Sequence, residues 1–121
     1  MIIVDEIHTC KSPTSQQGKN LLKLKNAKYK IGLTGTVIMN SPVDAYMPLK
    51  WIGKEHSNFS TFKKYYFQYG GLFNNEIVGY KNINVLKDEL SQVSLRRTKE
   101  LLNLPEKNII HEIIGLNNEQ R

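Results

Sequence analysis

The start of the chain joins a short apolar run directly to a pair of carboxylates. Ile2, Ile3 and Val4 are β-branched, and Asp5 and Glu6 follow at once. The run is too short for a helix and is typical of a strand buried on both faces of a parallel sheet. Because ligands of open α/β sheets bind outside the carboxyl ends of the strands, the acidic pair is predicted to lie at a binding edge.

Two adjacent carboxylates at such an edge can divide the work of phosphoryl transfer. One holds Mg²⁺, directly or through water, and the other polarises the attacking water. The alternative is a strand that simply ends in an acidic turn. Asp5 and Glu6 alone leave both interpretations open, because so short a motif often occurs by chance.

The distribution of charge indicates an anionic partner. The 121 residues include 17 Lys or Arg and 11 Asp or Glu, a formal net charge of +6. No acidic residue occurs between Glu6 and Asp44, whereas six lysines do: Lys11, Lys19, Lys23, Lys25, Lys28 and Lys30. A block of one sign is typical of a face that binds a phosphate backbone, and a solvated basic surface is the alternative.

Several classes of protein do not fit this composition. Cys10 is the single cysteine, so no internal disulfide can form, and a reducing intracellular compartment fits. His111 and Glu112 begin like a zinc-protease helix, but Gly115 stands where the second His is needed. No apolar run approaches the roughly 20 residues of a membrane span, and no signal-peptide pattern occurs.

Periodicity and turn residues predict an alternation of helices and short strands. Ser12 and Pro13 indicate a helix start, with Leu21, Leu22 and Leu24 facing inward. Ser41, Pro42 and Asp44 indicate a second helix start. The predicted helices span 14–25, 42–52, 60–68 and 85–93, with a helical turn at 98–102; strands are predicted at 1–4, 29–33 and 108–114, and a loop or hairpin at 69–80. The aromatic residues of 59–69 are predicted to form core rather than a stacking platform for bases.

Three motifs together resemble a known family. Val-Asp-Glu-Ile-His at 4–8 resembles the DExH motif of superfamily-two helicases. The stretch at 31–42, with Thr-Gly-Thr at its centre, resembles motif III of the Swi/Snf-type DNA translocases. Leu-Arg-Arg-Thr-Lys-Glu at 95–100, followed by Leu-Pro-Glu-Lys at 104–107, is similar to the end of that family's first ATPase lobe.

The resemblance implies an α/β fold, namely part of a RecA-like P-loop NTPase lobe with parallel strands. Residues 1–52 and 95–121 would belong to the lobe, and 53–94 would be a helical insertion. The activity implied is that of a DNA-dependent ATPase of the helicase type, with ATP and Mg²⁺ as cofactors. Asp5 would hold Mg²⁺ through water, and Glu6 would be the general base for the attacking water.

The resemblance also implies a coupling role for a second set of residues. His8 would connect the nucleotide site to motif III. Thr34, Gly35 and Thr36 would couple the nucleotide state to DNA contact. The family usually has Pro where this chain has Val37, which weakens the expected turn. From the residues alone, His8 and Thr34 are predicted only to make local hydrogen bonds within turns.

Two parts of such an ATPase are not found in the sequence. No Gly-x-x-x-x-Gly-Lys-Ser/Thr occurs; in the nearest string, Pro13 replaces the first Gly and Asn20 the Ser/Thr. The second lobe with its arginine finger is not found either. We therefore expect the second half of a first ATPase lobe, cut from or encoded apart from the rest, and inactive alone.

The expected partners are the remainder of the ATPase core and double-stranded DNA, bound without sequence preference. Lys11, Lys19, Lys23 and Lys25 are the candidate DNA-binding residues, and no membrane is involved. One alternative is a non-catalytic remnant that binds DNA or a protein. Another is a metal-dependent nuclease using Asp5 and Glu6, for which too few further carboxylates lie nearby.

Overall fold

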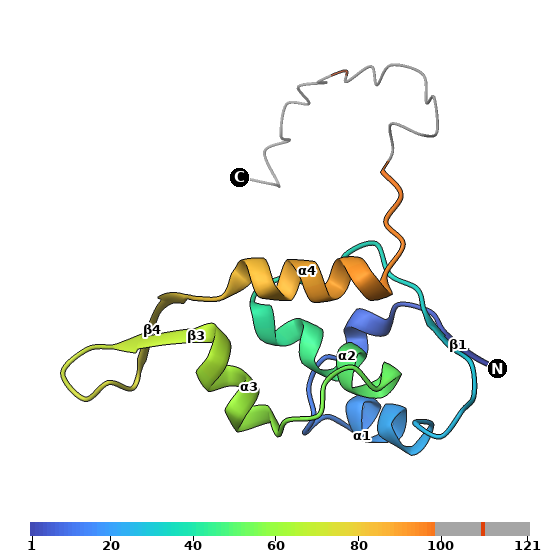
Figure 1. Cartoon of the computed structure of the whole chain (residues 1–121), viewed down its shortest axis with the longest axis horizontal. Coiled ribbons are helices and arrows are strands. Elements are labelled where there is room, and N and C mark those ends of the chain that lie inside the picture. The colour runs from blue at the N-terminus through green and yellow to red at the C-terminus, as the bar shows by residue number, and fades with distance from the viewer. Residues whose placement is uncertain (99–109, 111–121) are drawn as a thin grey trace, which may run out of the picture.

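The structure is a computed structural model that describes residues 1–98 and 110 (Figure 1). The elements run in the order β1 (Ile2–Val4), η1 (Ile7–Cys10), α1 (Gln16–Lys23), β2 (Lys30–Gly32), η2 (Pro42–Ala45), α2 (Tyr46–Ile52), α3 (Phe59–Tyr66), β3 (Phe67–Gly70), β4 (Glu76–Tyr80) and α4 (Ile83–Val93), where η denotes a 3-10 helix. This confirms a mixed helix and strand fold. No helix among the described residues combines the length and the apolar character needed to cross a membrane.

Strands β1 and β2 form a two-stranded parallel sheet, as the sequence predicts. Ile2, Ile3 and Val4 pair with Lys30, Ile31 and Gly32. Helix α1 lies between the two strands in the chain, which makes it the crossover that parallel pairing requires. A Cβ at Gly32 would lie 2.7 Å from Cδ1 of Ile7, so a larger residue there would require the Ile7 side chain to move.

The prediction that the first strand is buried on both faces is wrong for the described residues. Ile2 and Val4 pack against a small core of Ile7, Cys10, Leu21 and Trp51. The side chain of Ile3, which points to the opposite face, is 53% exposed. Parallel sheets are buried when elements cover both faces, and among the described residues one layer covers one face.

Helix α1 begins later and ends earlier than predicted. Its N-cap is Ser15, whose Oγ accepts a hydrogen bond of 3.1 Å from the Gly18 backbone N–H, so Ser12 is not the cap. Leu21 is buried as predicted, but Leu24 is exposed. The helix ends at Lys23, so Leu24 no longer follows the helical period that would turn it inward.

The larger core lies among α2, α3 and α4. Its buried residues are Ala45, Tyr46, Met47, Leu49, Phe62, Tyr66 and Leu86. The rings of Tyr46 and Phe62 have centroids 5.1 Å apart, and those of Phe62 and Tyr66 4.6 Å. This packing confirms that the aromatic stretch contributes mainly to the core, and Leu86 anchors α4 to it.

Strands β3 and β4 form an antiparallel hairpin that projects from the body of the molecule (Figure 1). The hairpin and helices α3 and α4 fall in the stretch predicted as an insertion, residues 53–94. The helical turn predicted at 98–102 and the strand predicted at 108–114 lie outside the described residues, apart from Thr98 and Ile110.

Candidate active site

The segments that follow β1 and β2 remain bonded to each other beyond the sheet. The Leu33 backbone N–H donates to the Val4 carbonyl at 2.8 Å. The Ile7 backbone N–H then donates to the Leu33 carbonyl at 3.0 Å. These bonds bring the acidic pair after β1 beside Thr34 after β2, at the carboxyl edge of the sheet.

The turn that carries the acidic pair has a specific backbone conformation. Glu6 has φ 49° and ψ 47°, the left-handed region that residues other than glycine seldom adopt. Its backbone N–H donates to Oδ1 of Asp5 at 2.9 Å. Both side chains are exposed. The left-handed residue reverses the chain into η1 and leaves both carboxylates facing solvent.

His8 connects the two predicted motifs directly. Its Nδ1 lies 3.1 Å from Oε2 of Glu6 and 2.9 Å from Oγ1 of Thr34, a residue 26 positions away. The Thr34 hydroxyl donates to the Thr36 carbonyl and accepts from the Thr36 backbone N–H. Because that hydroxyl has a single proton, His8 must supply the proton in its own contact. The geometry therefore assigns Nδ1 as a donor shared by the Glu6 carboxylate and the Thr34 oxygen.

Asp5 fits the role of a metal ligand that acts through water. Among the described residues, no three His, Cys, Asp or Glu side chains lie close enough to hold a metal ion by themselves. Mg²⁺ usually keeps several waters and binds one or two carboxylates together with substrate phosphates. One exposed carboxylate at the sheet edge suits that pattern and does not suit a closed metal site.

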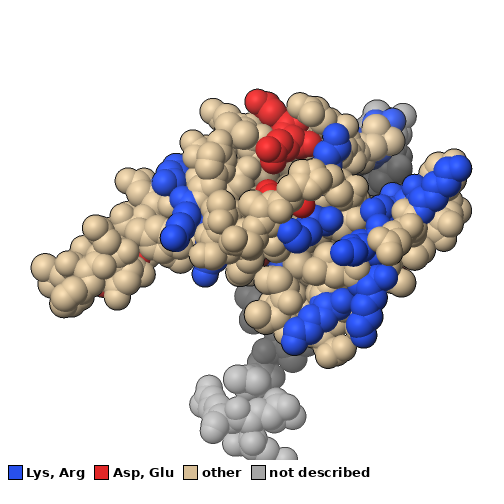
Figure 2. All heavy atoms as spheres, turned by 60° about the horizontal axis from the view of Figure 1, so that its bottom comes forward, with Lys and Arg blue, Asp and Glu red and all other residues tan. Residues whose placement is uncertain are grey.

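The predicted DNA-binding lysines fall into two groups. Lys19, Lys23 and Lys25 are exposed, on α1 and directly after it. Figure 2 shows Lys and Arg side chains gathered toward the right of one face, with few Asp or Glu among them. Lys11 differs, because its Nζ lies 3.4 Å from Oδ1 of Asp44, which is buried. That carboxylate compensates part of its charge.

Asp44 holds the segment that follows the predicted motif III, a role that sequence reasoning assigned only as a helix cap. Its Oδ2 accepts backbone N–H bonds from Asn40 at 2.8 Å, Met39 at 3.1 Å and Ser41 at 3.4 Å. Burial alone would raise the pKa of Asp44, but these N–H groups and the Lys11 ammonium outweigh it and hold the pKa below its ordinary value. The signal in the sequence was the spacing of Ser41, Pro42 and Asp44.

Comparison with known proteins gives a consistent result over the whole chain. The family described as the SNF2-related domain matches residues 1–121. A putative SWI/SNF-related matrix-associated actin-dependent regulator of chromatin subfamily A member 3-like 1 from Arabidopsis thaliana is 33% identical over 122 residues, covering 99% of this chain and 13% of the relative. Transcription termination factor 2 from Drosophila melanogaster is 31% identical over 127 residues, covering 98% and 11%. The chain thus spans about an eighth of each relative's length, and no solved structure matches it significantly.

Proposed function

Because the chain belongs to the SNF2-related domain family, we propose that it forms the water-activating and coupling part of a RecA-like ATPase lobe. The parent activity is ATP-driven movement along DNA. Residues 1–52 and 95–121 supply the lobe, and residues 53–94 are an insertion in it. The proposal is supported by the parallel pairing of β1 with β2, whose carboxyl ends carry the acidic pair and Thr34.

The contact of His8 with both Glu6 and Thr34 is the observation that carries the proposal. It joins the carboxylate that acts on water to the turn Thr34, Gly35 and Thr36 through a single proton on Nδ1. A shift of Thr34 would change the partner of that proton and so the position of Glu6. This is a physical route by which nucleotide state and DNA contact influence each other.

Asp5 and Glu6 take different roles in phosphoryl transfer. Bound Mg²⁺ and ATP would supply the reacting phosphate and the neutralisation of its charge. Asp5 would hold the ion through water. Glu6 would orient the attacking water and accept its proton, a function that needs an exposed carboxylate held in place. The phosphates themselves would be held by a glycine-rich loop that these 121 residues do not contain.

The second part of the proposal concerns DNA. Lys19, Lys23 and Lys25 present three exposed ammonium groups, on α1 and directly after it. Such groups bind the phosphate backbone without reading sequence. The names of the two relatives refer to chromatin regulation and transcription termination, which supports duplex DNA as the partner. We therefore also propose an intracellular site of action, where DNA is present.

A second candidate function follows from the missing phosphate loop. A chain that keeps the fold and the lysines but holds no nucleotide could serve as a DNA- or protein-binding module. The specific observation in its favour is that no Gly-x-x-x-x-Gly-Lys-Ser/Thr occurs in these 121 residues.

The test joins this chain, covalently or by co-expression, to the remainder of an SNF2 ATPase core and measures DNA-stimulated ATP hydrolysis. Glu6→Gln should lower turnover by ~10²–10⁴-fold with nucleotide affinity nearly unchanged, because the amide can position water but cannot accept its proton. Asp5→Asn should weaken Mg²⁺-dependent nucleotide binding as well, because a neutral amide is a poorer ligand for a hard cation.

Asp88→Asn, which alters an exposed carboxylate on α4, is the matched control and should leave both quantities unchanged. Near wild-type turnover of Glu6→Gln in an active reconstituted enzyme would contradict the catalytic proposal. Complete absence of nucleotide binding in every joined form would favour the binding-module alternative.

A further inference from the structure

The tip of the β3–β4 hairpin presents two large apolar side chains to solvent. Leu72 is 98% exposed and Phe73 is 85% exposed. Gly71 with φ 81° and Asn74 with φ 51° build the turn around them. A turn can be made from polar residues alone, so two apolar side chains at full exposure are not required by the fold. Exposed apolar residues gathered at one place mark an interaction site.

The hairpin itself is nearly uncharged. Glu76 is the single charged residue between Phe67 and Tyr80. A Cβ built on Gly71 would lie 2.8 Å from Cδ of Glu76, so the Glu76 side chain lies against the backbone of the turn. The tip therefore presents two apolar side chains and one exposed carboxylate, that of Glu76.

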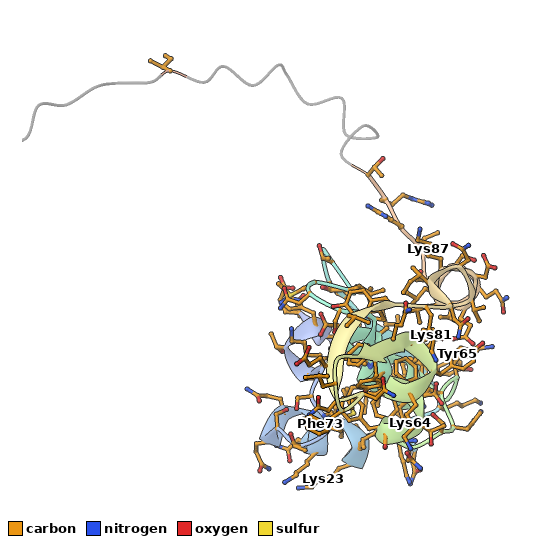
Figure 3. The ribbon with its side chains drawn as sticks, turned by 90° about the vertical axis from the view of Figure 1, so that its left-hand side faces the viewer. Lys23, Lys64, Tyr65, Phe73, Lys81 and Lys87 are labelled. Atoms are coloured by element: carbon orange, nitrogen blue, oxygen red, sulfur yellow. The ribbon has the colours of Figure 1, made fainter. Side chains whose placement is uncertain are left out.

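The base of the hairpin is basic. Lys64 lies in the last turn of α3 and Lys81 follows β4, and both side chains are exposed. The Lys81 backbone N–H donates to the Tyr66 carbonyl at 2.9 Å, which fixes this residue to the end of α3. In the view along the hairpin, Lys64, Tyr65 and Lys81 lie to the right of Phe73, with Lys87 above them (Figure 3). Asp88 and Glu89 lie further along α4, and Glu89 accepts from the Tyr66 hydroxyl.

We propose that the β3–β4 hairpin is a second contact with duplex DNA, in which Leu72 and Phe73 insert at a base step while Lys64 and Lys81 hold the flanking phosphates. Apolar side chains that enter the minor groove partly unstack a step and bend the duplex. The arrangement matches that task, because insertion between stacked bases favours apolar side chains and the phosphate backbone favours cations. The inference rests on the proposed function insofar as DNA is the partner.

The experiment uses the whole chain and a 20-base-pair duplex with 2-aminopurine at a central step, without nucleotide. We expect the fluorescence to rise on binding, because the base leaves its stack. Leu72→Ser/Phe73→Ser should bind about 10-fold more weakly, abolish the rise at saturation and keep the salt dependence. Lys64→Gln/Lys81→Gln should reduce the slope of log affinity against log salt by about 1–2 and keep the rise.

Two matched controls keep the result specific. Leu95→Ser removes another largely exposed apolar side chain, outside the hairpin, and Lys54→Gln removes an exposed lysine after α2. Both should bind as the wild type does. Far-ultraviolet circular dichroism confirms that each variant keeps its helices.

The proposal would be overturned by wild-type affinity in the tip variant or by the lack of any fluorescence rise. The proposal would also be overturned if the tip variant bound DNA normally but self-associated differently from the wild type in sedimentation. That result would make a second copy of the protein the partner of the tip. The Lys19, Lys23 and Lys25 group is tested separately by K19E/K23E/K25E. If K19E/K23E/K25E loses binding and the tip variant binds normally, only the hairpin proposal is contradicted. If the tip variant loses binding and K19E/K23E/K25E binds normally, only the proposal for the α1 lysines is contradicted.

Discussion

Glu6 combines a strained backbone with the side chain on which the proposed chemistry depends. A left-handed conformation costs a residue with a Cβ about 1–2 kcal/mol, and glycine avoids this cost. The conformation persists because the Ile7 backbone N–H is bonded to Leu33 and because η1 begins immediately afterwards. Strain of this kind is often found at functional sites, where the surrounding structure maintains it.

This strain can be measured by comparing two substitutions that both remove the carboxylate. Glu6→Ala keeps the penalty and Glu6→Gly relieves it, so we expect the glycine variant to be more stable than the alanine variant by about 1 kcal/mol in the free energy of unfolding. Urea denaturation followed by circular dichroism gives both values. Equal stability of the two variants would show that the turn stores no strain at this position.

At the same scale, the contact of His8 shows why single residues were difficult to assign from sequence. The acidic pair could be recognised because both carboxylates adjoin an apolar strand. The His8 contact depends on Thr34, which is 26 residues away in the chain. Local pattern contains no information about that distance, so only the resemblance to a family gave His8 a role in advance.

Asp44 organises an element, namely the segment that leads from the predicted motif III into η2. Its carboxylate accepts three backbone N–H groups and pairs with Lys11. The neutral amide of an Asn would accept hydrogen bonds from these buried N–H groups less strongly than the carboxylate does. The same carboxylate ties Lys11, after η1, to η2, so it connects the segments that follow both predicted motifs.

Stability should depend on pH through this group. The pKa of Asp44 is lowered in the folded state, so its stabilisation is complete above the unfolded pKa of about 4 and is lost as pH falls through the lower folded pKa. We expect Asp44→Asn to destabilise the protein by about 1–3 kcal/mol at pH 7. That difference from wild type should shrink as pH falls below about 4.

Thermal unfolding between pH 2 and 7 measures this difference. Lys11→Met removes only the ion pair with Asp44, and we expect a cost of about 0–1 kcal/mol because the lysine is partly exposed. A pH-independent difference between wild type and Asp44→Asn would mean that the carboxylate charge does not stabilise the segment.

For the whole molecule, the arrangement of exposed charge is the clearest functional feature. Figure 2 shows Lys and Arg side chains gathered on one face. Lys19, Lys23 and Lys25 are exposed, whereas Lys30 is half-buried. Its Nζ donates to the carbonyls of Lys25 and Trp51, both at 2.8 Å, so it holds the end of the α1 segment against α2. The basic block in the sequence thus contains two kinds of lysine. Lys11 and Lys30 make contacts that hold the fold, whereas Lys19, Lys23 and Lys25 are exposed.

We expect K19E/K23E/K25E to abolish sequence-independent binding of duplex DNA at low salt, because three phosphate contacts become repulsive. The corresponding triple Gln variant should bind weakly, with the slope of log affinity against log salt reduced by about 2–3. Fluorescence anisotropy with two unrelated duplex sequences measures both effects. Unchanged affinity in the triple Glu variant would exclude this surface as the DNA contact.

The sequence by itself determined the parallel strands, the helix start at Ser41, the aromatic core and the place of the acidic pair. These features depend on local period and on turn residues, which act within a few positions of the chain. The Swi/Snf-type resemblance, read from three motifs, was confirmed by the family match over residues 1–121.

Tertiary structure alone decided the features that depend on distant segments. The exposure of Ile3 follows from which elements cover the sheet, and the inward or outward direction of Leu24 follows from where α1 ends. The compensation of Lys11 by Asp44 and the shared proton of His8 require residues far apart in sequence to meet. The physical reason is that burial and pairing are set by the packing of whole elements, whereas the sequence pattern reports only the preference of each element alone.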